Sequence, residues 1–148
     1  MKFLSLALLL FTGTVAAAQD TYWQQQLRYN IKASLNDKEH SITASETIVY
    51  KNNSPAALDF IWFHIWPNAY KNETTALLQQ LKNDKERSKK KEFYGEGNIE
   101  GLSFTVNGKA AKTEAHSNPQ YIDIIKLLLD KPLQPGDSIT IATPFKVK

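Results

Sequence analysis

The chain has 148 residues, of which 42% are hydrophobic and 11% aromatic, and its formal net charge at neutral pH is +3. That length suits a single domain, and the apolar content is sufficient for a packed core. The sequence has no cysteine, which excludes disulfides and thiolate metal sites, and so small a net charge does not favour nucleic acid as a partner.

Residues 1–18, MKFLSLALLLFTGTVAAA, have the three parts of a secretory signal peptide. Lys2 supplies the positive charge, an apolar run of about nine residues follows, and Ala16 and Ala18 form a small-residue cleavage site. The run is shorter than the roughly 18 apolar residues that a membrane span needs. We therefore predict an exported protein, periplasmic or extracellular, whose mature domain is residues 19–148 and has no membrane span.

Two strands joined by a short turn are predicted next. Apolar and polar residues alternate from Leu27 to Leu35, which predicts a half-buried strand. A polar turn at 36–40 leads to a second strand at 41–52, and a turn at 53–55 leads to a third, so the three form an antiparallel meander. One face of the second strand carries mainly apolar side chains: Ile42, Ala44, Ile48 and Tyr50.

The third strand belongs to an aromatic segment, LDFIWFHIWPNAY, at residues 58–70. Successive side chains of a strand point to opposite faces. One face then carries Phe60, Trp62, His64 and Trp66, and the other carries Ile61, Phe63 and Ile65. Because both faces are apolar, we expect a central strand that is covered on both sides, ending at Pro67.

Residues 71–97 interrupt the strand pattern. Either Thr74 or Thr75 is suited to cap a helix within residues 74–91, with Leu77, Leu78 and Leu81 on one side. The segment 82–92, KNDKERSKKKE, has no apolar residue. Acidic neighbours dilute its lysines, so a solvated helix end or mobile loop is favoured over an anion or membrane contact.

Strand patterns then resume. A strand at 99–106 leads into Asn107-Gly108, a strong hairpin signal. Further strands are expected at 121–129 and 138–148, separated by a turn at 132–137. Because the last strand is still in progress at Lys148, we expect further chain beyond it. Six or seven strands with one helix predict a mainly β fold, an antiparallel sandwich or saddle with one helical, charged insertion.

No catalytic, cofactor-binding or metal-binding residue is predicted for this chain. His40, His64 and His116 are too far apart in the sequence to form a local ligand pair. His64 is expected to be a core histidine bonded to a backbone carbonyl. Glu46 falls on the apolar face of its strand, where an unpaired carboxylate is costly, so we expect it to meet Arg28 or Lys32, or to lie at a sheet edge.

The order of these segments resembles the N-terminal β domain of the alanyl aminopeptidase family of zinc metallopeptidases, the gluzincins. The matching segments are Tyr29-Asn30-Ile31 with Leu35, residues 40–54, residues 58–70, Gly101-Leu102, Val106-Asn107-Gly108 and residues 129–145. The phrase FHIWPNAY, followed by a lysine-rich insertion, is most similar to secreted members from Bacteroidetes-type bacteria. The resemblance covers nearly the whole mature chain, and it is the order of the motifs, not any single one, that is specific.

The resemblance implies a non-catalytic domain that packs on its own downstream catalytic domain and helps to close a cavity for the peptide substrate. In the family, zinc is held by a His-Glu-x-x-His helix and a later Glu, and the substrate amine is held by a Gly-x-Met-Glu-Asn strand. None of these motifs has a counterpart in this sequence. Zinc is therefore implied for the missing catalytic domain alone, and the fragment itself is not expected to be an enzyme.

A second interpretation is a free-standing secreted β-sandwich that binds a glycan or an envelope protein. Trp23, Trp62 and Trp66 are the candidates for a sugar-binding platform. Two of these tryptophans lie in the segment predicted to be buried, so the sequence favours the aminopeptidase domain.

Overall fold

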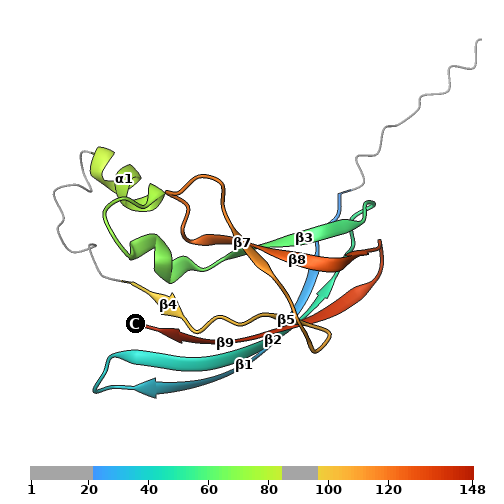
Figure 1. Ribbon diagram of the computed structural model, residues 1–148, viewed down its shortest axis with the longest axis horizontal. Coiled ribbons are helices and arrows are strands. Elements are labelled where there is room, and N and C mark those ends of the chain that lie inside the picture. Colours follow the sequence, from blue (N-terminus) through green and yellow to red (C-terminus); the bar gives the residue numbers. More distant parts are fainter. Residues whose placement is uncertain (1–21, 85–96) are drawn as a thin grey trace, which may run out of the picture.

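The computed structural model describes residues 22–84 and 97–148, and these form two facing antiparallel β-sheets with one short α-helix at one end (Figure 1). The predicted signal peptide, residues 1–18, lies outside the described residues, as does the part of the lysine-rich segment at residues 85–92. The chain is mainly β, as the sequence predicts, and its architecture is that of a sandwich.

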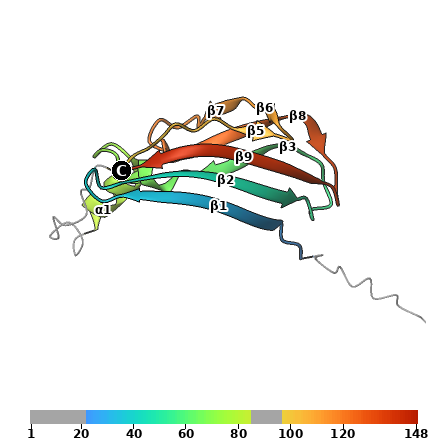
Figure 2. The ribbon, with the colours of Figure 1, turned by 90° about the horizontal axis from the view of Figure 1, so that it is seen from below.

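The large sheet has six strands in the order β1-β2-β9-β5-β6, with β4 also paired to β9. Every pairing in it is antiparallel. The strands are β1 (Gln26–Asn36), β2 (Ser41–Lys51), β4 (Ile99–Glu100), β5 (Thr105–Val106), β6 (Lys109–Ala110) and β9 (Ser138–Val147). Figure 2 shows β1, β2 and β9 as long, curved neighbours, with β1 at the margin.

The small sheet has three strands in the order β3-β8-β7. They are β3 (Leu58–His64), β7 (Thr113–Ala115) and β8 (Ile124–Leu133). Between β3 and β4 the chain forms a 3₁₀-helix, η1 (Trp66–Tyr70), and the helix α1 (Ala76–Asn83). Both lie at the end of the sandwich near the C-terminus of β9 (Figure 1).

The core lies between the two sheets, where most of the inward-facing residues are apolar. Its buried centre consists of Ile48, Ile61, Phe104, Leu127 and Ile141. Leu127 and Ile141, one from each sheet, are fully buried. The period-two pattern of β2 therefore identified correctly the face of that strand that carries the buried Ala44 and Ile48.

The hairpin predicted at Asn107-Gly108 is confirmed. Both residues have positive φ, 50° and 79°, as a type I′ turn requires, and they join β5 to β6. The Asn107 side chain also accepts a 2.9 Å hydrogen bond from the backbone N–H of Thr140. The strand predicted at 99–106 is divided into β4 and β5 after Gly101, whose φ of 74° takes the backbone out of the extended region.

Helix α1 is capped by Thr75, one of the two residues that the sequence proposed. The Thr75 Oγ1 atom accepts a hydrogen bond from the backbone N–H of Leu78 and donates one of 2.6 Å to the carbonyl of Ala69. Leu78 is the buried residue of the helix. Thr75 therefore fixes both the start of α1 and its position on η1.

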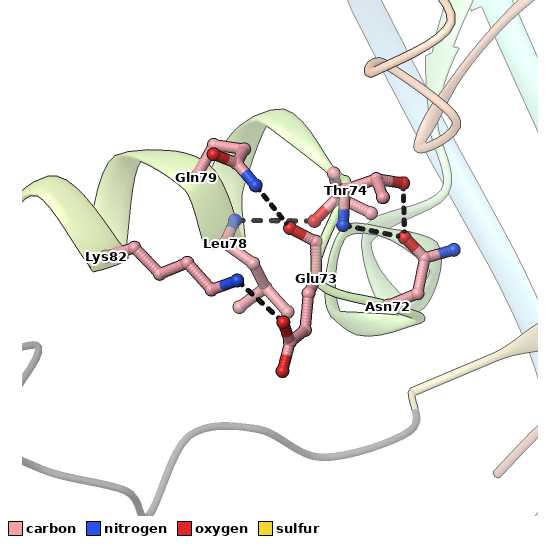
Figure 3. Close-up of polar contacts among 7 residues, drawn as sticks. Asn72, Glu73, Thr74, Leu78, Gln79 and Lys82 are labelled. Carbon is pink, nitrogen blue, oxygen red and sulfur yellow. Dashed lines mark hydrogen bonds and ion pairs between the residues drawn. The ribbon is translucent and has the colours of Figure 1, made fainter.

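The turn before α1 has its own polar contacts (Figure 3). Asn72 Oδ1 accepts hydrogen bonds from the backbone N–H and the hydroxyl of Thr74. Lys82 donates a 2.6 Å hydrogen bond to the Glu73 carboxylate, which together with the lysine's charge lowers the pKa of Glu73. Because Glu73 is exposed, this ion pair adds little to stability.

The prediction of a half-buried β1 is wrong, because all eleven of its residues are exposed. The alternation itself is real, since Leu27, Tyr29, Ile31 and Leu35 share the inward face of the large sheet with the buried Ile48 of β2. The described part of the chain places no element over that face at β1. The apolar side of β1 is therefore left open to solvent.

The prediction that β3 is a central strand covered on both faces is also wrong. β3 lies at one edge of the small sheet, and only the face with Ile61 and Phe63 meets the core. The opposite face is open, with Phe60 38% and Trp62 46% exposed. Apolar residues on both faces of the segment predicted that both faces would be covered. In the described part of the chain, the large sheet covers only the face with Ile61 and Phe63.

Candidate functional site

The outer face of the small sheet carries two groups of aromatic rings, which together we call the aromatic surface. It consists of Phe60, Trp62 and His64 on β3, Trp66 on η1, and His116 and Tyr121 from the chain between β7 and β8. The strand alternation places the three β3 side chains together, because Ile61 and Phe63 between them turn inward.

Four of the rings form one chain of contacts. The Trp62 ring centroid lies 5.7 Å from that of Phe60, in an edge-to-face arrangement, and 5.5 Å from that of His116. His116 in turn meets Tyr121 edge to face at 4.9 Å. These separations and angles are those of favourable aromatic pairs. The rings thus hold one another in place while remaining partly exposed.

His64 and Trp66 form a second, stacked pair. Their ring centroids are 4.8 Å apart and their planes differ by 14°. Trp66 is 59% exposed, so one face of its indole rests on the imidazole and much of the rest meets solvent. Stacking on the imidazole restrains the Trp66 side chain, so less conformational entropy is lost when a ligand contacts it.

Polar groups surround these rings. His64 Nδ1 lies 3.7 Å from Asp123 Oδ2, too long for a direct hydrogen bond but close enough for an ion pair when the imidazole is protonated. The prediction of a core histidine is therefore wrong: the His64 side chain is 49% exposed and faces a carboxylate. His116 Nδ1 accepts a 3.0 Å hydrogen bond from the backbone N–H of Asn118, so its Nδ1 carries no proton in this arrangement.

Lys126 of β8 supplies the cation of this face. Its Nζ lies 4.4 Å from the centroid of the Phe60 ring and 3.4 Å from the Glu114 carboxylate. The lysine therefore combines a cation–π contact with an ion pair. The charge of Lys126 is therefore matched by that of Glu114 within the aromatic surface.

Sequence reasoning identified four of the six rings of the aromatic surface. It placed Phe60, Trp62, His64 and Trp66 on one face but assigned that face to the interior. It missed the contributions of His116, Tyr121, Asp123 and Lys126, which are about 50 to 65 positions away in the chain. Only the pairing of β3 with β8 brings them together. Trp23, the third tryptophan proposed for a platform, makes no ring contact with them in the described part of the chain.

The remaining candidate residues are dispersed. His40 lies in the β1–β2 turn with a φ of 49°, far along the chain from His64 and His116. Within residues 22–84 and 97–148, no three side chains able to bind a metal lie together. No described helix has the length and apolar composition needed to cross a bilayer.

Glu46 is placed on the inward face of β2, opposite Ile31. It has no ion pair among the described residues, and partial burial raises its pKa. Arg28 and Lys32, the proposed partners, lie opposite Val49 and Ser45 and therefore on the other face of the sheet. Their expected pairing with Glu46 is wrong. The alternative, a position at a sheet edge, is wrong too, because β2 is an interior strand that pairs with both β1 and β9.

A pocket of about 450 Å³ lies between the β5–β6 hairpin and the end of β8. Its ionisable lining residues are Lys109, Asp130, Lys131 and Asp137. The hydroxyl residue Ser138 also lines it. The aromatic surface remains the more distinctive feature, and its chemistry is that of contact and binding.

No protein-family model matches this chain, and no curated protein matches it.

Proposed function

We propose that this chain is the N-terminal, non-catalytic domain of an exported zinc-dependent aminopeptidase, an enzyme that removes N-terminal residues from peptides. The observation that carries the proposal is the ordered set of motifs from Tyr29 to Phe145, which resembles the β domain of the gluzincin aminopeptidases. The two antiparallel sheets are compatible with that domain. Residues 1–18 support export through the features of a signal peptide.

In this proposal the chain contributes binding surface and no chemistry of its own. Zinc and the glutamate that activates the metal-bound water belong to a downstream catalytic domain. That domain is the proposed partner, and the peptide substrate would lie between the two. Solvent-exposed aromatic residues on the outer face of β3 offer a surface on which such a partner can pack.

The proposal is tested by the reading frame that contains this chain. We expect a His-Glu-x-x-His motif within a few hundred residues after Lys148 and, in the full product, hydrolysis of an aminoacyl nitroanilide that a zinc chelator abolishes. The 148-residue chain alone should show no such turnover. A stop codon directly after Lys148 in an intact gene, or metal-dependent turnover by this chain alone, would contradict the proposal.

Export is tested separately. Expression with residues 1–18 in a Gram-negative host should give a periplasmic product whose intact mass shows loss of the segment. Recovery of an unprocessed cytoplasmic chain would contradict the export proposal and leave the domain proposal unaffected.

The exposure of Trp62 and Trp66 favours a second candidate, a free-standing glycan-binding module. Aromatic faces can stack on the apolar C–H faces of sugar rings, and the polar groups of His64, His116 and Asp123 stand beside them. Titration of neutral oligosaccharides into the chain should then quench tryptophan fluorescence. Trp66→Ala should abolish the quenching, whereas Trp23→Ala, which alters another exposed tryptophan outside the surface, should not.

A further inference from the structure

Strand β1 has both an exposed apolar face and a backbone edge that pairs with no other strand in the described part of the chain. Its inward side chains are exposed, with Ile31 at 54% and Leu35 at 72%. Its outer edge is also free, since the described part of the chain pairs β1 with β2 alone. Figure 2 shows β1 running along the margin of the large sheet. Long, apolar edges of this kind are sites where another strand can add.

The register identifies which backbone groups face that open edge. In antiparallel sheets, residues alternate between bonding to one neighbour strand and to the other. The N–H of Asn107 donates to the carbonyl of Thr140, and Lys148 exchanges two bonds with Asn98. Even-numbered residues of β9 therefore bond toward β4 and β5, and odd-numbered ones bond toward β2.

The same alternation carries across β2. Ile141 of β9 lies opposite Ile48, so the even-numbered residues of β2 bond to β9 and the odd-numbered ones to β1. Ser45 of β2 lies opposite Lys32, so the even-numbered residues of β1 bond to β2. The open edge therefore presents the backbone N–H and C=O groups of Leu27, Tyr29, Ile31, Ala33 and Leu35.

We propose that β1 pairs antiparallel with β1 of a second copy of this chain, about a two-fold axis at Ile31, to give a homodimer with a continuous sheet. Ile31 is the middle residue of the strand, so this axis pairs the whole of it. Five residue pairs that exchange two bonds each give about ten hydrogen bonds, the number in a typical protein interface. This inference does not depend on the proposed aminopeptidase function.

The sequence of β1 is complementary to itself about this axis. On the apolar face Leu27 lies opposite the second copy's Leu35, and Ile31 lies opposite its own counterpart. On the polar face Arg28 lies opposite Ser34, and Asn30 opposite Lys32. Apolar residues thus meet apolar ones, and no like charges are directly opposed. Shifting the axis to Lys32 would oppose two lysines, and shifting it to Asn30 would oppose Arg28 to Lys32.

This pairing also ends at two copies. An isologous contact uses the β1 edge of both subunits. The opposite edge of the large sheet is β6, which has two residues and offers little for further addition. Arg28 and Lys32 from the two copies lie diagonally across the junction, about 7–8 Å apart. Their repulsion predicts a dimer that strengthens as salt is added.

The absence of cysteine from the chain allows single-cysteine variants to test this register. Ile31→Cys should form a disulfide-linked dimer on removal of reductant, because residues of a hydrogen-bonded pair have Cα atoms about 5.5 Å apart, within disulfide range. Leu35→Cys is the matched control. It is an exposed residue on the same face, but the two copies of it would be about 26 Å apart. A mixture of the Leu27→Cys and Leu35→Cys variants should cross-link with each other.

The unmodified full chain, produced through the export pathway, should sediment as a dimer in equilibrium with monomer. Ile31→Lys, which opposes two lysines at the axis, should weaken dimerisation about tenfold or more. Thr140→Lys, which adds the same charge on β9 away from the edge, should leave it unchanged. Circular dichroism confirms that both variants are folded. A chain that stays monomeric, or equal cross-linking by Ile31→Cys and Leu35→Cys, would overturn the proposal.

Discussion

Asn52 donates a 2.9 Å hydrogen bond from its side-chain amide to the backbone carbonyl of Leu133, 81 positions away. Asn52 follows the last residue of β2 in the large sheet, and Leu133 ends β8 in the small sheet. The same amide donates to the carbonyl of Ala56, and its oxygen accepts from the backbone N–H and hydroxyl of Ser54. One fully buried side chain thus links both sheets at the end opposite α1.

Replacement of Asn52 by Ala should therefore be strongly destabilising. It removes the Asn52 partner of the Leu133 carbonyl and of the Ser54 backbone N–H at a buried site, for an expected loss of about 2–4 kcal/mol in the free energy of unfolding. Urea denaturation of the full chain measures this. Asn53→Ala is the control, because the Asn53 side chain donates to the Gln24 carbonyl at an exposed position, and it should cost less than about 1 kcal/mol.

The burial of Asn52 also affects which asparagine of the folded chain is accessible for N-glycosylation. Both Asn52 and Asn72 begin an N-x-S/T sequon. The Asn52 amide is enclosed and fully engaged, whereas Asn72 lies on the exposed turn before α1 (Figure 3). A folded chain offers Asn72 alone of the two to a modifying enzyme.

Two neighbouring residues of β3 should respond differently to truncation. Ile61 faces the core and is 7% exposed, so Ile61→Ala should cost about 2–5 kcal/mol. Trp62 faces outward, so Trp62→Ala should cost about 1–2 kcal/mol, from contacts with Phe60 and His116. Unfolding midpoints in urea compare the two. A larger loss for Trp62→Ala would mean that the aromatic face is covered after all.

Glu46 should make stability depend on pH. Burial raises the pKa of Glu46 above its ordinary value of 4.5, so between these two values the folded chain binds more protons than the unfolded chain. Stability therefore falls as the pH rises through that window, and the penalty is complete above it. Glu46→Gln should raise the unfolding midpoint at pH 7 and have no such benefit below pH 4.5.

Glu100→Gln is the matched control for Glu46, because Glu100 is an exposed glutamate on the short strand β4. It should leave the pH dependence of the midpoint unchanged. Equal effects of the two substitutions would show that the inward position of Glu46 has no energetic consequence.

The helix cap at Thr75 should contribute about 1–2 kcal/mol to the free energy of unfolding. Thr75→Ala removes the acceptor for Leu78 and the donor to Ala69, both at a buried site. Thr75→Ser keeps the hydroxyl and should retain most of the stability. Hydrogen exchange at the amide of Leu78 reports the loss directly, and equal protection in the two variants would contradict the role of the hydroxyl.

The sequence by itself determined the local structure of this protein. Alternating side chains in β2 and β3, the turn residues Asn107 and Gly108, and the capping residue Thr75 act through neighbours a few positions away, so their effects are readable from the chain. The class of fold, mainly β with antiparallel strands, follows from the same short-range patterns.

Only the tertiary structure decided which faces are covered. The apolar faces of β1 and β3 have the same period-two pattern as buried strands, but sheet order puts both strands at edges. Strand pairing likewise brings Asp123 and Lys126 to the rings of His64 and Phe60. These relationships depend on the pairing of distant segments and on the relative size of the two sheets, which no local pattern encodes, and they create both the aromatic surface and the open edge of β1.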